Sequence, residues 1–272
     1  MVSALRGLQS PDSPAGTDLE PVVIAPVLPG HAADDGSVAP VAPDWDDNLA
    51  SVVSRLQGAL ADAGATAPVH LVGYSLGARV ALGVALEAPE KIARLTLIGV
   101  HPGLATEDER RARRASDQTW IDLLLQGGIE AFVGEWENHP VFASQAELPA
   151  EVRAAQRRIR LSHTAAGLAD SLQCMGLGRM PCYRDRVAEL AMPVTLVTGE
   201  RDDRFSLLAD QLAGQIRDPI SWTGQNDAAC QRITVPGCGH NPVLEQPGAI
   251  ARLLARDPSH GHAGDPERPG AS

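Results

Sequence analysis

The sequence predicts an α/β fold, in which a mostly parallel sheet has helices on both faces and carries an inserted helical cap. The first observation is that short apolar runs alternate with longer stretches whose apolar residues recur every three or four positions. The second is that this alternation stops between about residues 101 and 186, where polar and helical stretches dominate. Strands that alternate with helices along a chain pair in parallel, so we expect one layered core with an insertion.

The composition is that of a folded acidic protein. The chain has 272 residues, of which 44% are hydrophobic and 21% charged, and this is enough to bury a full core. Its formal net charge of −11 argues against nucleic acid or an anionic membrane surface as a partner. No apolar run approaches the ~20 residues that span a bilayer, and no signal peptide is visible. We therefore predict a cytoplasmic protein, with a monomer favoured.

The cysteines give no sign of a metal site. None of the four forms a C-x-x-C pair, and their spacings match no zinc pattern. We interpret them as reduced thiols and expect neither a metal nor an organic cofactor. The cysteines are Cys174, Cys182, Cys230 and Cys238.

Residues 1–100 are predicted to form the first part of the core. The helices are indicated by apolar residues at helical spacing, and the strands by short runs rich in valine and leucine. Strands are expected at residues 22–28, 69–72 and 94–100, and helices at 46–64 and from 76 to about 87.

The rest of the chain divides into three predicted parts. Residues 101–186 form the helical cap, and residues 187–256 form the second part of the core. Residues 257–272 are polar and rich in Pro and Gly, which predicts a disordered tail. In the second part of the core, strands are expected at 193–198 and 232–235, and helices at 207–216 and 242–255.

A candidate nucleophile lies in the run Gly73-Tyr74-Ser75-Leu76-Gly77, between a predicted strand and a predicted helix. In this context a sharp turn lifts the serine hydroxyl above the sheet, and the small residues on either side avoid clashes with the neighbouring backbone. The N–H of Leu76, at the start of the helix, is then a candidate oxyanion donor.

A candidate acid and a candidate base follow in chain order. Glu200, Asp202 and Asp203 all come just after the predicted strand at residues 193–198. His240 ends the Gly-rich run GCGH, directly after the last predicted strand. A histidine there can act as the base for the serine, and an acid can fix its tautomer. The order serine, acid, histidine is typical of the α/β-hydrolase fold.

Several runs together resemble one family more closely than the serine motif alone does. They are HLVGYSLGARVAL, GVHPGL, SDQTW, EW followed by HPVF, GERDDRF and GHN. These runs resemble the 2-succinyl-6-hydroxy-2,4-cyclohexadiene-1-carboxylate synthases of menaquinone biosynthesis, over about residues 22–254. The resemblance implies that Asp202, which follows Gly-Glu-Arg, is the acid of the triad.

The resemblance also implies a reaction. In that family a base removes a ring proton from 2-succinyl-5-enolpyruvyl-6-hydroxy-3-cyclohexene-1-carboxylate, and pyruvate leaves without an acyl-enzyme. The enzyme would be a carbon–oxygen lyase that needs no cofactor. Ser75, tuned by His240 and Asp202, would then be the proton-abstracting base instead of a nucleophile.

The substrate of that family is a small polycarboxylate, which arginine recognises well because its planar fork matches a carboxylate. The resemblance implies that six residues bind this substrate, namely Arg79, Arg113 and Arg160, together with Tyr74, Trp120 and Trp136. A solvated charge run would also explain Arg113 and Arg160, and packing inside the cap would also explain the two tryptophans.

The sequence departs from the family pattern near its beginning. The family carries an early His-Gly-aromatic motif that supplies a second oxyanion donor, and no such run precedes the LPGH run that ends at His31. Ala32 also replaces the usual glycine after that histidine. Either the sequence as given starts late or the protein is shortened. A missing central strand would leave backbone groups unpaired, so we expect the chain as given to be poorly stable and weakly active.

Two other functions stay open at this point. The same triad serves hydrolases that cleave esters or carbon–carbon bonds with Ser75 as a true nucleophile. The arginines favour the lyase, since a hydrolase of lipophilic esters would prefer an apolar cap. A non-enzymatic binding module is the third reading, because the second oxyanion donor is absent.

Overall fold

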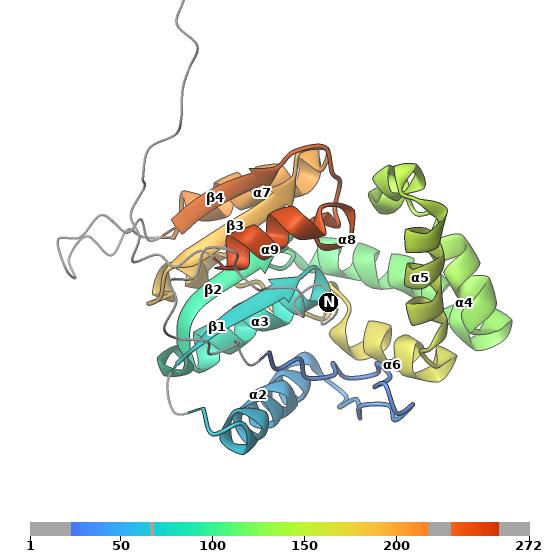
Figure 1. Ribbon diagram of the computed structural model, residues 1–272. Helices are drawn as coiled ribbons and strands as arrows, with labels where there is room; N and C mark the ends of the chain where they lie inside the picture. Colours follow the sequence, from blue (N-terminus) through green and yellow to red (C-terminus); the bar gives the residue numbers. More distant parts are fainter. Residues whose placement is uncertain (1–22, 66–67, 217–229, 256–272) are drawn as a thin grey trace, which may run out of the picture.

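The computed structural model describes residues 23–65, 68–216 and 230–255. Its centre is a parallel four-stranded sheet in the order β1-β2-β3-β4 (Figure 1). Helices lie between successive strands, so the predicted α/β class is confirmed. The strands are β1 (Val69–Tyr74), β2 (Ile92–Ile98), β3 (Val194–Gly199) and β4 (Cys230–Val235).

The register of the sheet brings the carboxyl ends of the strands to one edge. Tyr74 of β1 pairs with Ile98 of β2, and Gly199 of β3 pairs with Val235 of β4. The ladder continues one residue past β1, where the N–H of Ser75 donates to the carbonyl of Ile98 at 2.9 Å. The loops that follow these strands therefore meet, as loops do at the ligand-binding edge of open α/β sheets.

Alternating side chains on the strands build a core on each face of the sheet. Leu95 and Leu97 of β2 pack into the larger cluster, while Ile98 faces a smaller cluster with Ile250. Helices therefore cover both faces, as predicted. The larger cluster is covered by α2 (Trp45–Asp62), α3 (Leu76–Glu87) and α7 (Asp203–Ala213), and the smaller one by α9 (Pro247–Ala255).

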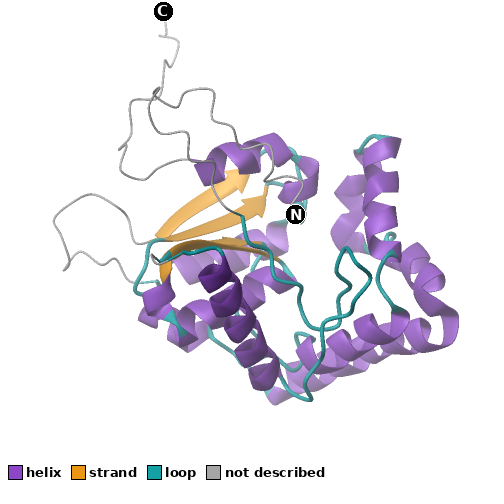
Figure 2. Cartoon of the chain, turned by 60° about the horizontal axis from the view of Figure 1, so that its bottom comes forward, coloured by secondary structure: helices purple, strands orange, loops and turns teal. Residues whose placement is uncertain are grey.

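A helical insertion, residues 107–175, separates β2 from β3 and lies to one side of the sheet (Figures 1 and 2). Its first helix spans 30 residues but is kinked at Gly128, where φ is 76°. The insertion has an apolar cluster of its own, which includes Leu124 and Val133. The predicted cap limits of 101–186 remain a prediction. The insertion contains α4 (Glu107–Trp136), the 3₁₀ helix η2 (Pro140–Glu147), α5 (Ala150–Leu161) and α6 (Ala165–Met175).

Two expected elements differ from the structure. Residues 23–28 form no strand, and Pro26 within this run has no N–H to donate to a ladder. The expected helix at 242–255 is two helices, α8 (Pro242–Glu245) and α9, because the chain leaves the helical conformation at Gln246, directly before Pro247.

Some expectations fall outside the described residues, namely those that concern residues 1–22 and the tail at 257–272. Among the strands that the structure describes, β1 pairs with β2 and forms one edge of the sheet. None of the described helices is both long and apolar enough to cross a membrane.

Candidate active site

Ser75 lies on the sharp turn between β1 and α3. Its φ of 50° and ψ of −111° make it the one non-glycine residue with positive φ in the described part of the chain. A Cβ on Gly73 would come within 2.3 Å of the carbonyl oxygen of Gly77, so glycine is required there. A Cβ on Gly77 would meet no described atom within 4 Å, so the expected steric reason holds for Gly73 alone.

The three predicted triad residues are joined by hydrogen bonds. His240 Nδ1 lies 2.7 Å from Asp202 Oδ2, and His240 Nε2 lies 3.2 Å from Ser75 Oγ. An ionised carboxylate only accepts, so with Asp202 ionised Nδ1 carries the ring proton and Nε2 is free to accept the serine proton. The side chain of His240 is 5% exposed and that of Asp202 10%. His240 is therefore a base that is shielded from solvent and lies next to the Ser75 hydroxyl.

The structure separates the three acids that follow β3. Asp202 binds His240 and also caps α7, since its Oδ1 accepts the N–H of Phe205 at 3.4 Å. Glu200 instead accepts the backbone N–H of Gly237 at 2.8 Å. Asp203 is exposed and is the first residue of α7. Asp202 is therefore the acid that contacts the histidine.

The His240 ring is held between aromatic neighbours. The ring centroid of Phe205 lies 4.2 Å away and that of Tyr74 5.5 Å away. Burial raises the pKa of the Tyr74 phenol, and the negative charge of Glu245 adds to this effect. Tyr74 therefore stays neutral at physiological pH and can only offer or accept a hydrogen bond.

The predicted oxyanion donor lies beside the serine. Leu76 is the first residue of α3, and the first N–H groups of a helix have no acceptor within the helix. Its N–H is therefore available to a negatively charged oxygen above Ser75, where the helix dipole also favours negative charge.

Two of the three predicted arginines lie close together. Arg79 is half-buried, and its Nη1 donates to the carbonyl of Met175 in α6 at 3.1 Å. Burial and, to a smaller extent, the positive charge of Arg113 together lower the pKa of Arg79 to about 10. Arg113 Nε donates to Asp117 Oδ1 at 2.7 Å, and burial raises the pKa of Asp117 while Arg113 opposes the rise. The positive charge here exceeds what Asp117 balances.

His101 lies next to this positive region. Burial lowers its pKa to about 4, and the charges of Arg204, Arg79 and Arg113 contribute to the shift. Its Nδ1 accepts the N–H of Gly103 at 3.1 Å. His101 is therefore neutral at neutral pH, and its ring accepts a hydrogen bond from the backbone of the loop that follows it.

Arg160 is placed differently from the other two arginines. Its Nη1 donates to Glu137 at 3.2 Å, its Nη2 donates to Gln145 at 3.4 Å, and its guanidinium lies over the ring of Phe142. The side chain is 15% exposed, so the charge run that contains it is not simply a solvated surface.

The two predicted tryptophans belong to the aromatic packing of the insertion. Trp120 and Trp136 meet edge to face with their ring centroids 5.1 Å apart, and Phe132 contacts both. Neither lines the pocket beside His240. Their packing inside the insertion accounts for them without a ligand, and their assignment to the substrate pocket stays a prediction.

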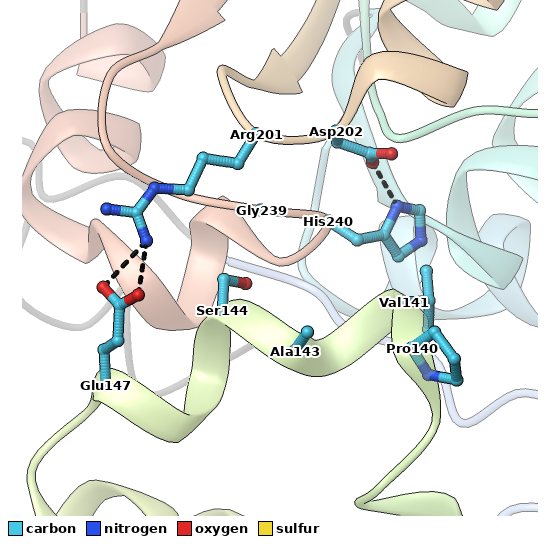
Figure 3. A pocket seen from close by; sticks show the side chains of 9 residues that line it. All are labelled: Pro140, Val141, Ala143, Ser144, Glu147, Arg201, Asp202, Gly239 and His240. Carbon is cyan, nitrogen blue, oxygen red and sulfur yellow. Dashed lines mark hydrogen bonds and ion pairs between the residues drawn. The ribbon is translucent and has the colours of Figure 1, made fainter.

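A pocket of about 340 Å³ lies between η2 and the loop that carries His240 (Figure 3). Arg201 and Glu147 form an ion pair across it, with Arg201 Nη1 at 2.8 and 2.7 Å from the two carboxylate oxygens. The run HPVF, which carries part of the family resemblance, includes the first residues of η2, but the sequence assigned no residue of η2 to the site. The pocket is lined by Pro140, Val141, Ala143, Ser144 and Glu147 of η2 and by Arg201, Asp202, Gly239 and His240 of the core.

Sequence reasoning also missed Glu245, whose carboxylate binds the backbone on both sides of His240. The only sign of this contact in the sequence is a glutamate five residues after the histidine. Among the described residues, no group of three or more His, Cys, Asp and Glu side chains is arranged to hold a metal ion.

Comparison with known proteins gives two kinds of match. The model of the alpha/beta hydrolase family matches residues 5–253. The solved structure of MenH from S. aureus superposes with a TM-score of 0.71 and 30% identity, and the match covers 84% of this chain and 79% of that one. A thermophilic esterase from Thermogutta terrifontis gives a TM-score of 0.63 at 21% identity, covers 80% and 73%, and supports the fold alone.

Curated relatives give the same answer. A Salmonella typhimurium 2-succinyl-6-hydroxy-2,4-cyclohexadiene-1-carboxylate synthase is 33% identical over 84% of this chain and 80% of its own length. A Bacillus subtilis protein, named provisionally as the same synthase, is 38% identical over 69% of this chain and 64% of its own length. The chain thus spans slightly less than two thirds of the Bacillus subtilis relative. The chain belongs to the α/β-hydrolase family and, within it, to the 2-succinyl-6-hydroxy-2,4-cyclohexadiene-1-carboxylate synthases.

Proposed function

We propose that this protein is a pyruvate-eliminating carbon–oxygen lyase of menaquinone biosynthesis. Its substrate would be 2-succinyl-5-enolpyruvyl-6-hydroxy-3-cyclohexene-1-carboxylate, and its product 2-succinyl-6-hydroxy-2,4-cyclohexadiene-1-carboxylate. The observation that carries the proposal is the continuous hydrogen-bonded chain from Asp202 through His240 to Ser75. Family membership and the two arginines near Asp117 support it.

The triad geometry suits proton abstraction. His240 Nε2 accepts the hydroxyl proton of Ser75, and the Ser75 oxygen then removes a proton from the substrate ring. The electron pair of the broken C–H bond at C2 forms a double bond between C2 and C3. The existing double bond between C3 and C4 moves to C4 and C5, and the bond from C5 to the enolpyruvyl oxygen breaks. The leaving group takes a proton and becomes pyruvate. Asp202 holds the His240 ring and stabilises the imidazolium that forms.

The arginines suit a substrate with several carboxylates. Arg79 is a half-buried cation, and electrostatic interactions are stronger where water is partly excluded than in bulk solvent. Arg113 leaves Nη donors beside the Nε that binds Asp117. We assign both to substrate carboxylates. We assign Arg160, Tyr74, Trp120 and Trp136 to the same small-molecule site on the strength of the resemblance.

The assay that tests the proposal follows pyruvate release from the enolpyruvyl substrate. The native chain should turn over, and Ser75→Ala should lower kcat about 10³-fold or more because the base is removed. Ser162→Ala is the control, since the Ser162 hydroxyl is exposed and bonds to Ile159. Release of no pyruvate, together with cleavage of simple esters that depends on Ser75, would overturn the lyase and favour the hydrolase.

A further inference from the structure

The loop that carries His240 is intrinsically adaptable. It runs Gly237-Cys238-Gly239, and Gly237 has a φ of 71°. Glycine restricts the backbone less than any other residue, so these residues do not by themselves fix where His240 points. Yet the imidazole must keep both Ser75 and Asp202 within hydrogen-bond distance. Some other group must hold the loop.

One carboxylate binds the backbone on both sides of His240. Glu245 Oε2 accepts the N–H of Gly239 at 2.7 Å, and Glu245 Oε1 accepts the N–H of Asn241 at 3.3 Å. Hydrogen bonds to an ionised acceptor are stronger than neutral ones. The two peptide units that flank His240 therefore have one common anchor.

The anchor is itself fixed to the loop. Glu245 ends α8, and its N–H donates to the carbonyl of Asn241 at 2.9 Å. The Asn241 side chain caps the same helix, since its Oδ1 accepts the N–H of Leu244 at 3.2 Å. Loop and helix thus form a closed ring of hydrogen bonds around His240, in which the Glu245 side chain is the only charged member.

We propose that Glu245 is a positioning residue for catalysis, which acts by holding the His240 backbone so that the ring stays aligned with Ser75 and Asp202. The inference deepens the proposed function, since it names a residue that supports the same base. A displacement of about 1 Å in a reacting group costs up to ~10²-fold in rate. Glu245 does not line the pocket, so its loss should lower kcat and leave KM unchanged.

Glu200, which directly follows β3, provides a matched control because it contacts the same loop. Its carboxylate accepts one backbone N–H, that of Gly237, at 2.8 Å. This contact lies three residues before His240, whereas the Glu245 contacts flank it directly. If both carboxylates only stabilise the fold, removing either one should change kcat and the thermal midpoint to the same extent. A positioning role predicts that only the Glu245 variant loses activity beyond its loss of stability.

The experiment compares Glu245→Gln, Glu245→Asp and Glu200→Gln with the native chain. We expect Glu245→Gln to lower kcat about 10- to 100-fold with KM within about twofold, since an amide can accept only one of the two N–H groups. Glu245→Asp keeps both carboxylate oxygens and the charge on a shorter side chain, so it should recover part of the loss. Glu200→Gln should change kcat by less than about twofold at a similar thermal midpoint. Equal kcat losses in Glu245→Gln and Glu200→Gln, or none in Glu245→Gln, would overturn the inference.

A second measurement does not depend on the substrate. The proton on His240 Nδ1 that bonds to Asp202 should give a low-field proton NMR signal in the native chain and in Glu200→Gln. The signal should broaden or vanish in Glu245→Gln and in Glu245→Asp. An unchanged signal in both Glu245 variants would contradict the positioning role. If the native chain shows the signal but releases no pyruvate, the proposed function fails while the role of Glu245 is still decided.

Discussion

Gly99, the residue after β2, lies directly against the imidazole of His240. A Cβ at Gly99 would come 2.8 Å from His240 Cε1 and 3.2 Å from Nδ1, and the φ of Gly99 is 59°. The N–H of Gly99 donates to the carbonyl of Val197 at 2.9 Å, so the sheet fixes its position. A side chain there would therefore have to displace the histidine ring, and not the strand.

Gly99→Ala should inactivate the enzyme more than it destabilises it. Displacing the ring separates Nε2 of His240 from Ser75 Oγ, so we expect kcat to fall about 10²-fold. The positive φ should lower the free energy of unfolding by about 1 kcal/mol. Steady-state kinetics and denaturant unfolding measure the two effects.

Gly36→Ala is the control for backbone strain. Gly36 has a φ of 80°, and a Cβ there would meet no described atom within 4 Å. It should show a similar loss of stability with kcat unchanged. If both variants retained the native kcat, the contact between Gly99 and His240 would not affect catalysis.

Arg113 offers a test of carboxylate binding. Its removal alone would leave Asp117, 4% exposed, without its partner. The double variant Arg113→Gln with Asp117→Asn removes both charges and keeps a hydrogen bond. We expect KM to rise about 10- to 100-fold, the equivalent of one charged hydrogen bond, with the thermal midpoint little changed.

Arg111→Gln is the matched control on the same helix. Arg111 pairs with Asp108, and both side chains are exposed. Exposed pairs of this kind contribute little to stability. KM should stay at the native value. An equal rise of KM in Arg111→Gln would mean that general positive charge, and not a site at Arg113, attracts the substrate.

The order of the sequence motifs identified a candidate serine, three candidate acids and a candidate histidine, but it did not by itself select the acid. Glu200, Asp202 and Asp203 all follow one strand, and only the resemblance favoured Asp202 before its contact with His240 was seen. The role of Glu245 was not predictable, because it depends on where a short helix returns to the preceding loop. Such side chain–backbone contacts leave no periodic pattern in a sequence.

The errors in the predicted elements had visible signals. Pro26 lies inside the run that was predicted as a strand, and Pro247 lies inside the predicted closing helix. Both lack an N–H and interrupt regular hydrogen bonding. A proline inside an apolar run therefore decides the local structure more strongly than the spacing of the apolar residues around it.

Acid should destabilise the fold through its buried histidines. Burial lowers the pKa of His70 and of His101 to about 4 from an ordinary 6.5. The unfolded chain then binds protons that the folded chain does not, so stability is full above about pH 6.5 and is lost as the pH falls towards 4. Each group contributes at most about 3 kcal/mol over this range.

His70→Gln isolates one of these contributions. The glutamine does not titrate and can still bond to Thr96, whose hydroxyl lies 2.8 Å from His70 Nε2. Urea unfolding between pH 7.5 and 4.5 should show a shallower loss of stability in the variant than in the native chain. Identical slopes would show that His70 titrates in the folded state as it does in the unfolded one.

Ser144 provides a prediction in which removing a polar group stabilises the protein. Its Oγ is buried and finds no hydrogen-bond partner among the described residues. It packs against Gly239, where a Cβ would lie 2.2 Å from that oxygen. A buried hydroxyl without a partner is unfavourable relative to a methyl group. Ser144→Ala should therefore raise the free energy of unfolding by about 1 kcal/mol in urea titrations.

Ser162→Ala is again the comparison, because the Ser162 hydroxyl does have a partner, the carbonyl of Ile159 at 2.8 Å. It should leave the free energy of unfolding unchanged or slightly lower. A drop for Ser144→Ala of the same size would mean that the Ser144 hydroxyl is satisfied in solution. If the free energy of unfolding rises for Ser144→Ala alone, the Ser144 hydroxyl destabilises the native fold. The destabilising contact then lies between η2 and the loop that carries His240, next to the proposed base.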